Sequence, residues 1–264
     1  IAHCSLLSTH CSLLEDFMNQ TVLVIADHPD DEVLGCGGTI ARHVAEGDEV
    51  HIIIMAEGLT SREQTRNVEA KQEELSVLAQ IAKNVGEFLG ATSVDLLAFP
   101  DNRMDSLPLL DIIKEVEVRL EKIKPGIVYT HYQEDLNIDH QITHQAVVTS
   151  CRPQPGQTVH TLLFFEIPSS TDWQIVGCGN TFAPNWIVDI SGFDGPFSFL
   201  DKKLKALEIY ESEMRPFPHA RSLEAVENLA RRRGASVGVE AAEGFVLGRF
   251  VKMQGARGKR QDRK

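Results

Sequence analysis

Four carboxylates and one imidazole stand within residues 27–32 (DHPDDE), directly after the apolar run 22–26. A second segment of similar chemistry, residues 131–144 (HYQEDLNIDHQITH), follows the apolar run 126–130. Carboxylates repel phosphate groups, whereas carboxylates and imidazoles are common ligands of catalytic zinc. These residue types therefore indicate a metal site.

The spacing within the two segments suits a catalytic metal, which uses three protein ligands and leaves a position for water. His28 and Asp31 lie three residues apart, and either His140 or His144 completes a set of two imidazoles and one carboxylate. A metal held there lowers the pKa of its bound water to about 7. A neighbouring carboxylate would then accept the proton as general base. Adjacent side chains in an extended turn diverge, so we expect only one of Asp30 and Asp31 to face the metal squarely. With Asp31 as the ligand, Asp30 is the candidate for the general base.

These side chains need a scaffold that brings the two segments together. Short runs rich in Val, Ile and Leu indicate strands covered on both faces, and apolar residues at helical spacing lie between them. The alternation predicts an α/β fold with a Rossmann-like, doubly wound, mostly parallel sheet flanked by helices in three α/β/α layers. We expect strands at 22–26, 50–56, 94–99, 126–130, 161–167, 186–190 and 244–251, and helices at 33–46, 63–89, 107–123, 198–213 and 222–233.

The position of the two segments along the chain supports the metal reading. In doubly wound sheets the active crevice lies beyond the carboxyl ends of the strands, where the strand order reverses, usually between strands one and four. The segments 27–32 and 131–144 follow these two strands. We therefore expect the fold to bring them together.

The glycines of the stretch GCGGTI raise an alternative, an NAD(P)-binding Rossmann-fold oxidoreductase. Such a protein places a ribose-binding acid about 20 residues downstream, where Glu57 stands. However, the stretch departs from the GxGxxG pattern at Ile40, and four acids surround the phosphate position. The glycines Gly35, Gly37 and Gly38 are explained equally well by close packing of a helix on the sheet. A non-catalytic sugar-binding protein is a third alternative.

Composition excludes other classes of protein. The 264 residues carry a formal net charge of −12, and 42% of them are hydrophobic. Nucleic-acid binding needs a basic face, so we expect no nucleic-acid partner. No apolar run reaches the roughly 20 residues that span a bilayer, and no basic signal-peptide segment is present, so we predict a cytoplasmic protein without an integral membrane segment. A homo-oligomer is compatible with the sequence.

The chain divides into one domain with two extensions. We expect residues 18–252 to form a single domain. The pentad HCSLL occurs twice ahead of Met18, which predicts that residues 1–17 are a non-native or disordered extension. Because residues 253–264 are rich in basic side chains, we expect them to form a disordered tail. The five scattered cysteines contain no CxxC pair, which indicates reduced thiols.

The stretch ADHPDDE (26–32) resembles the AHPDDE signature of the LmbE-like/PIG-L family of zinc-dependent N-acetylglucosaminyl deacetylases. NIDH (137–140) resembles the second family motif, HxDH, and the resemblance extends from about residue 20 to 251. It implies an LmbE-like fold and one Zn²⁺ held by His28, Asp31 and His140. Fe(II), Mn or Co would fit the same ligands. It also implies hydrolysis of the N-acetyl group of a small amino-sugar substrate, with the first Asp of the signature as general base.

The second motif departs from the family at Asn137, where relatives have a His that helps to stabilise the oxyanion and protonates the leaving amine. An Asn amide donates a hydrogen bond but delivers no proton at neutral pH. The general acid therefore stays open between Asp30 returning its proton, His131 and His219.

The resemblance also suggests residues that contact the substrate. Arg66 matches an Arg that binds substrate in relatives, and the segment 215–222 resembles a loop that covers the pocket. Trp173 could stack on a sugar ring, although we favour packing in the core. Asp101 and Asn102 follow the third expected strand at the catalytic end of the sheet and could touch sugar hydroxyls. His131 and Asp139 are further candidates for substrate contact.

Overall fold

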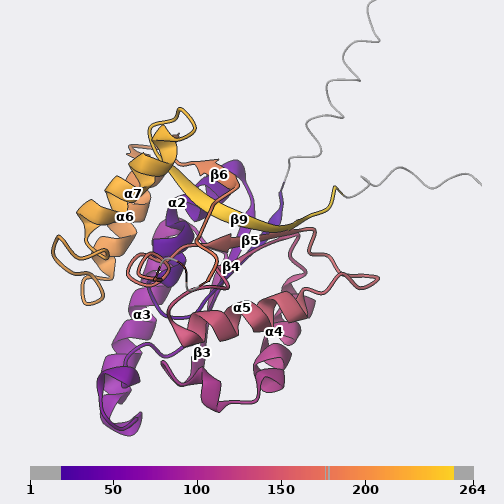
Figure 1. The fold of residues 1–264 in the computed structure, drawn as a ribbon, viewed down its shortest axis with the longest axis vertical. Helices are drawn as coiled ribbons and strands as arrows, with labels where there is room; N and C mark the ends of the chain where they lie inside the picture. Colours follow the sequence, from indigo (N-terminus) through magenta and orange to yellow (C-terminus); the bar gives the residue numbers. More distant parts are fainter. Residues whose placement is uncertain (1–18, 176, 178, 253–264) are drawn as a thin grey trace, which may run out of the picture.

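Seven strands form one sheet in the order β3-β2-β1-β4-β5-β9-β6 (Figure 1). The structure is a computed structural model that describes residues 19–175, 177 and 179–252. The predictions made for residues 1–17 and 253–264 lie outside this part of the chain. The strands of the sheet are β1 Thr21–Ala26, β2 Glu49–Ala56, β3 Ser93–Phe99, β4 Ile127–His131, β5 Thr161–Phe165, β6 Trp186–Asp189 and β9 Ala242–Phe250, and a separate pair consists of β7 Phe193–Asp194 and β8 Phe197–Ser198.

The sheet is mostly parallel, as predicted. Strands β1 to β5 pair in parallel, whereas β9 lies antiparallel between β5 and β6. Side chains of the central strand alternate between two apolar clusters, Val22 and Val24 facing one and Leu23 and Ile25 the other. This alternation buries β1 on both faces, which is why its sequence is continuously apolar.

Helices cover both faces of the sheet and complete the three predicted layers (Figure 1). One face packs against α2 Asp31–Glu46, α3 Gln72–Leu89, α6 Phe199–Ile209 and α7 Leu223–Ala235, and the other against α4 Leu109–Ile123 and α5 Ile138–Ser150. Each face therefore has its own hydrophobic core.

Helix α2 contains a kink at Cys36, whose φ of −149° and ψ of 26° are not helical. In an unbroken helix the carbonyl of Leu34 would accept a hydrogen bond from the amide of Gly38. Instead, the Leu34 carbonyl accepts from Nζ of Lys203 at 2.8 Å, and the Gly38 amide donates to Glu243 at 3.1 Å. Lys203 and Glu243 form an ion pair at 2.6 Å. The buried pair thus bridges the broken helical hydrogen bond.

The glycines of α2 allow close packing, as expected from the sequence. A Cβ atom on Gly38 would lie 2.8 Å from the side chain of Ile190, and one on Gly35 would overlap the ring of Phe165. A larger residue at either position would push α2 away from the sheet.

The predicted helix 63–89 is shorter in the structure, because α3 begins only at Gln72. Ahead of it lie two single 3₁₀ turns, Thr60–Arg62 and Glu69–Lys71. Residues 63–67 are all exposed. With no apolar stripe to bury, this polar stretch gains nothing from helix formation.

The segment 131–144 is only in part a loop, since β4 ends at His131 and α5 begins at Ile138. The side chain of Asn137 accepts a hydrogen bond from the amide of Asp139 at 2.9 Å and so caps this helix. The helix predicted at 198–213 ends at Ile209.

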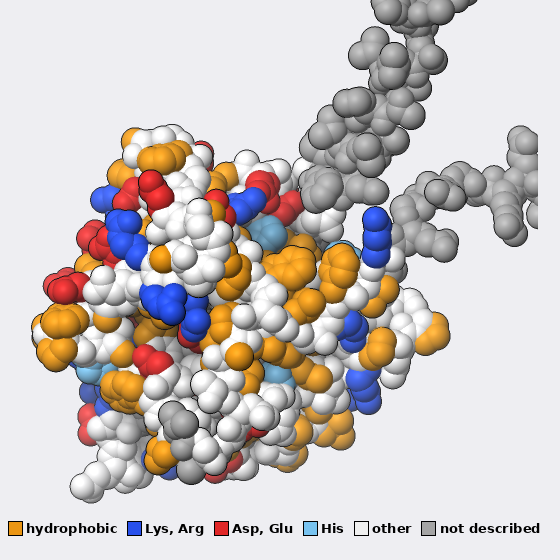
Figure 2. All heavy atoms as spheres, turned by 45° about the horizontal axis from the view of Figure 1, so that its top comes forward, with side chains coloured by type: hydrophobic (Ala, Val, Ile, Leu, Met, Phe, Trp, Pro, Cys, Tyr) orange, Lys and Arg blue, Asp and Glu red, His pale blue; other side chains and the backbone are white. Residues whose placement is uncertain are grey.

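On the face drawn in Figure 2, basic side chains are scattered among acidic and apolar ones. Among residues 19–175, 177 and 179–252, no helix combines the length and apolar character needed to cross a membrane.

Candidate metal centre

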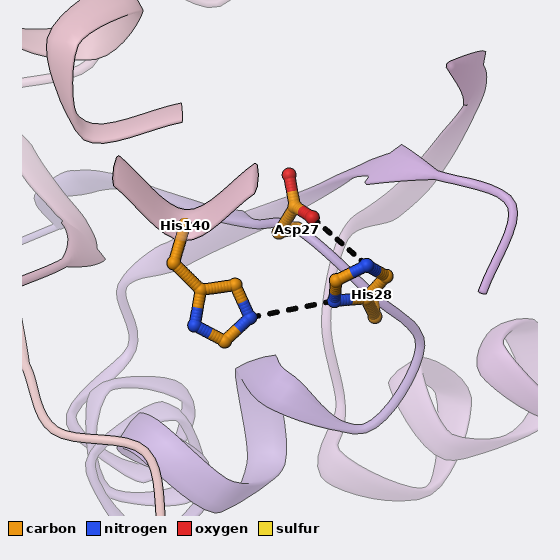
Figure 3. A group of neighbouring side chains, drawn as sticks. All are labelled: Asp27, His28 and His140. Carbon is orange, nitrogen blue, oxygen red and sulfur yellow. Dashed lines mark hydrogen bonds and ion pairs between the residues drawn. The ribbon is translucent and has the colours of Figure 1, made fainter. Parts of the chain in front are cut away.

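Strands β1 and β4 are neighbours in the sheet, with Ile25 paired to Thr130. The segments that follow them therefore leave the sheet side by side. His28 from the first segment faces His140 from the first turn of α5, with Nδ1 of His28 3.4 Å from Nε2 of His140 (Figure 3). The predicted meeting of the two His/Asp-rich segments is confirmed.

Three side-chain atoms form a small triangle at this point. Oδ2 of Asp31 lies 3.2 Å from Nδ1 of His28 and 3.0 Å from Nε2 of His140. Ligands about 2.0–2.1 Å from a tetrahedral zinc ion lie roughly 3.3 Å from one another. The triangle therefore has the size expected for three ligands of one zinc ion.

An unpaired anionic atom beside the triangle also favours a cation. Oδ1 of Asp31 is buried and has no hydrogen-bond partner among the described residues. A buried carboxylate oxygen without a partner is costly. A divalent cation would compensate this charge, so the residues present fit a metal ion.

The second nitrogen of each imidazole faces a carboxylate. Nε2 of His28 lies 3.1 Å from Asp27 (Figure 3) and 3.2 Å from Asp101, and Nδ1 of His140 lies 3.2 Å from Asp135. A His that ligates a metal commonly donates its other N–H to a carboxylate, which orients the ring. This arrangement favours Nδ1 of His28 and Nε2 of His140 as the ligand atoms.

Other groups of donors overlap with the triangle. Within each group the donor atoms lie close enough together to hold one ion. Because the groups share residues, the acids and imidazoles form a single continuous cluster. The overlapping groups are Asp27 with His28 and His140, Asp31 with His131 and His140, and His28 with Asp101 and Asp139.

His28 and His140 bind protons tightly when no metal is present. Burial opposes charge on His28 and His140, but the surrounding carboxylates outweigh it. They raise the pKa of His28 well above its usual value and the pKa of His140 to about 10. Burial likewise opposes charge on Asp31, yet His140 holds the pKa of Asp31 well below its usual range. Metal ions compete for the same lone pairs, so metal binding releases protons.

Asp30 has a different partner from Asp31. Its φ of 116° lies in a region that residues other than glycine rarely adopt. Oδ2 of Asp30 lies 2.7 Å from Nη1 of Arg221. Burial raises the pKa of Asp30 well above its usual value, and Arg221 offsets part of this effect. A carboxylate with a raised pKa is suited to accept a proton near neutral pH.

Two of the predicted substrate contacts are buried beside His28. Oδ1 of Asp101 and Oδ2 of Asp139 lie 3.2 and 3.7 Å from Nε2 of His28. Asp139 is also held by the amide of Met104 at 3.0 Å. Asn102 is exposed, and its amide donates to Asp101 at 2.8 Å. The two acids are therefore placed to orient His28, while Asn102 lies at the surface.

His131 lies behind the cluster and is fully buried. Its ring stacks on His140 with centroids 3.9 Å apart, and its Nε2 accepts from the amide of Asp27 at 2.8 Å. Burial holds the pKa of His131 well below its usual value, so the ring is neutral. This position gives His131 no exposed surface for a substrate.

His144 stands outside the triangle. Its Nδ1 lies 2.9 Å from the backbone carbonyl of His131, to which it donates. Between the two ligand candidates that the spacing left open, the geometry therefore favours His140.

Arg66 pairs with Glu57, the residue that follows β2. Its guanidinium binds the carboxylate of Glu57 through two hydrogen bonds of 2.9 and 3.1 Å. The hydroxyl of Thr60 donates to the same carboxylate at 2.5 Å. The acid that would bind ribose in a nucleotide site is therefore already occupied.

Trp173 is not a core residue, contrary to our expectation, since 52% of it is exposed. Its ring contacts His219 edge to face, with centroids 5.4 Å apart. Nδ1 of His219 accepts from the amide of Arg221 at 3.0 Å. Trp173 and His219 lie in turns, and Arg221 links this region to Asp30.

Comparisons with known proteins identify the family. The family described as PIG-L: GlcNAc-PI de-N-acetylase matches residues 23–151. An uncharacterized deacetylase of Escherichia coli K12, YaiS, is 30% identical over 154 residues, which cover 56% of this chain and 75% of YaiS. The chain belongs to the PIG-L (LmbE-like) family. The predicted family is thus confirmed.

Other PIG-L relatives extend over more of the chain. The diacetylchitobiose deacetylase of Thermococcus kodakarensis is 28% identical over 198 residues, 73% of this chain and 69% of that protein. The crystal structure of the conserved protein TT1542 from Thermus thermophilus superimposes with a TM-score of 0.66 at 25% identity, covering 89% of this chain and 97% of that one. The predicted LmbE-like fold is confirmed.

The structure shows the role of the Asn137 side chain in the second PIG-L motif. Asn137 stands where the family motif has His, and its side-chain oxygen is committed to capping α5. Its NH₂ group stays free of the cap and can donate a hydrogen bond.

Two residues of the centre were missed by the sequence analysis. Asp135 supports His140 and itself accepts from Ser170 and Thr171, the latter at 2.6 Å. Its only sequence signal is an acid within the segment that contains the PIG-L motif. Arg221 lies in the segment expected to cover the pocket, but nothing in the sequence distinguishes it from the other arginines.

Proposed function

We propose that this chain is a metal-dependent N-deacetylase that hydrolyses the acetamide of a small N-acetylated amino sugar. The observation that carries the proposal is the triangle of Asp31, His28 and His140 beside the buried carboxylate of Asp30. Membership of a family with deacetylase relatives, one of them a diacetylchitobiose deacetylase, supports the substrate class.

The finer parts of the proposal are the metal, the location and the assembly. Two imidazoles and one carboxylate support zinc, at one ion per chain, although Fe(II), Mn and Co accept the same donors. A cytoplasmic location and the option of a homo-oligomer rest on the sequence alone.

The residues around the triangle have distinct roles in the proposed reaction. Bound there, zinc would supply a Lewis acid that polarises the acetamide carbonyl and eases deprotonation of water. Oδ1 of Asp30, which has no partner among the described residues, accepts a proton from the attacking water. The water oxygen bonds to the acetamide carbon, and the amide group of Asn137 donates to the developing oxyanion.

Collapse of the tetrahedral species breaks the carbon–nitrogen bond. Asp30 returns its proton to the leaving amine, so acetate and a free amino sugar are released. His131 is too deeply buried for this step, and Nδ1 of His219, which accepts from the amide of Arg221, has no proton to give. Asp30 is therefore the best candidate for the general acid as well as the base.

The predicted substrate contacts divide into two groups. Arg66 and Asn102 have exposed polar groups, and we retain them as sugar contacts. Asp101, Asp139 and His131 are buried against the imidazoles, so we assign them to the support of His28 and His140.

The oxidoreductase alternative finds no support. The amides of Gly38 and Thr39, which a pyrophosphate would need, donate to Glu243 at 3.1 and 2.7 Å. A carboxylate thus fills the position of the phosphate. Glu57, the candidate for ribose binding, holds Arg66 instead.

Metal content and acetate release test the proposal together. Protein purified without chelator is assayed by elemental analysis, and on N-acetylglucosamine and diacetylchitobiose for acetate. We expect about one zinc ion per chain in the wild type and in the control His51→Ala, whose imidazole lies in β2 and contacts Ser93. His140→Ala should lose both metal and activity. A wild type that stays metal-free after zinc is supplied would overturn the proposal.

A further inference from the structure

Arg221 reaches the centre from the loop between α6 and α7. Its Nη1 lies 2.7 Å from Oδ2 of Asp30, a residue 191 positions earlier in the chain. Its Nη2 lies 3.8 Å from Oδ1 of Asp31. Among the described residues, Arg221 is the Lys or Arg that forms ion pairs with these two carboxylates.

The guanidinium is held in place from several sides. Its Nε donates to the hydroxyl of Ser169 at 2.8 Å, and its backbone amide donates to Nδ1 of His219 at 3.0 Å. Only 21% of its side chain is exposed. A long flexible side chain loses much rotamer freedom in such a site, so the contact with Asp30 is a built feature of the fold rather than a chance surface pair.

The contact distinguishes the two oxygens of Asp30. Oδ2 is bound by Arg221, whereas Oδ1 is buried without a hydrogen-bond partner among the described residues. The backbone of Asp30 is itself held in the left-handed region, with φ of 116°. A carboxylate fixed at the backbone and at one oxygen can present its other oxygen in only a narrow range of directions.

We infer that Arg221 is a positioning residue that holds Oδ2 of Asp30 so that Oδ1 faces the reacting water. This inference rests on the proposed deacetylase function. It concerns the geometry of the base, and Arg221 acts through Asp30 without touching the reacting atoms. Misplacing a reacting group by about 1 Å costs on the order of 100-fold in rate.

Steady-state kinetics on the metal-loaded protein tests the inference. Arg221→Ala should lower kcat about 100-fold and leave KM within about threefold, with zinc content unchanged. Arg221→Lys should recover only part of the rate, because an ammonium does not reproduce the fixed fork of a guanidinium. The matched control is Arg232→Ala, an exposed arginine in the last turn of α7, which should keep wild-type kinetics.

Two further readouts separate positioning from a merely structural role. Guanidinium ion at millimolar concentration should raise kcat of Arg221→Ala at least about tenfold, without effect on wild type or Asp30→Asn. In the Asp30→Asn variant, adding Arg221→Ala should lower kcat by less than a further factor of about three. The effects of two residues that act as a unit do not add.

The outcomes distinguish this inference from the function on which it rests. A wild type that binds zinc but releases no acetate overturns the proposed function and the inference with it. An active wild type whose Arg221→Ala variant keeps its kcat overturns the inference alone. So does an equally large loss from removing Arg221 in the Asp30→Asn background.

Discussion

Nδ1 of His140 lies 3.2 Å from Oδ1 of Asp135, on the opposite side of the imidazole from Asp31. The contact joins the candidate metal ligand to a carboxylate that is itself fixed by Ser170 and Thr171. The orientation of His140 thus depends on a loop beyond β5 as well as on its own helix.

Removing this support should weaken metal binding. Asp135→Asn keeps the shape of the side chain but not its charge, and we expect zinc affinity to fall about 10- to 100-fold. Competition with a chromophoric chelator measures the effect. Glu134→Gln, a neighbouring change whose carboxylate contacts none of the cluster residues, serves as the control. Equal affinities for wild type and Asp135→Asn would show that the contact does not tune the metal.

Metal removal should lower the thermal stability of the protein. The buried carboxylates of Asp27 and Asp31 lose their compensating cation, and a ligand present at 100 times its Kd stabilises the folded state by about 2.7 kcal/mol. For a chain of this size that corresponds to a decrease in Tm of about 5–10 °C. Calorimetry with and without EDTA, followed by addition of zinc, measures it. Identical Tm values would argue against a metal at this cluster.

The ion pair at the kink of α2 should contribute strongly to folding. Glu243→Ala leaves the buried Lys203 without a carboxylate to pair with, and the amides of Gly38 and Thr39 without an acceptor. We expect a loss of about 3–5 kcal/mol in the free energy of unfolding, measured by urea titration. Glu227→Ala removes an exposed pair with Arg231 and should cost less than about 1 kcal/mol. Similar losses in both variants would contradict this account.

The two buried thiols should resist alkylation. Burial raises the pKa of Cys36 well above its usual value and the pKa of Cys151 to about 12. Because the reactive thiolate forms only as the pH rises toward this pKa, both residues should stay unmodified by iodoacetamide at about pH 8 and react after unfolding in urea. Peptide mass spectrometry locates the modification. Rapid labelling of Cys151 in the native state would show that its site opens readily.

Much of the fold could be predicted because its signals are local. Continuous apolar runs mark β1, β2, β3 and β4 to within one residue of their observed bounds. The failure at 63–71 has a local reason too: residues 63–67 are polar and exposed, so no burial of an apolar face stabilises a helix there.

The sequence by itself determined that two His/Asp-rich segments follow strands one and four, and therefore that they would meet. The spacing of His28 and Asp31 is short-range and set by one turn of backbone. The long-range partners of Asp30 and of Gly38 were decided by tertiary structure alone. Arg221 contacts Asp30 across 191 positions, and Glu243 binds Gly38 across 205. Such contacts depend on how loops and strands pack around the sheet, and no local periodicity records that packing.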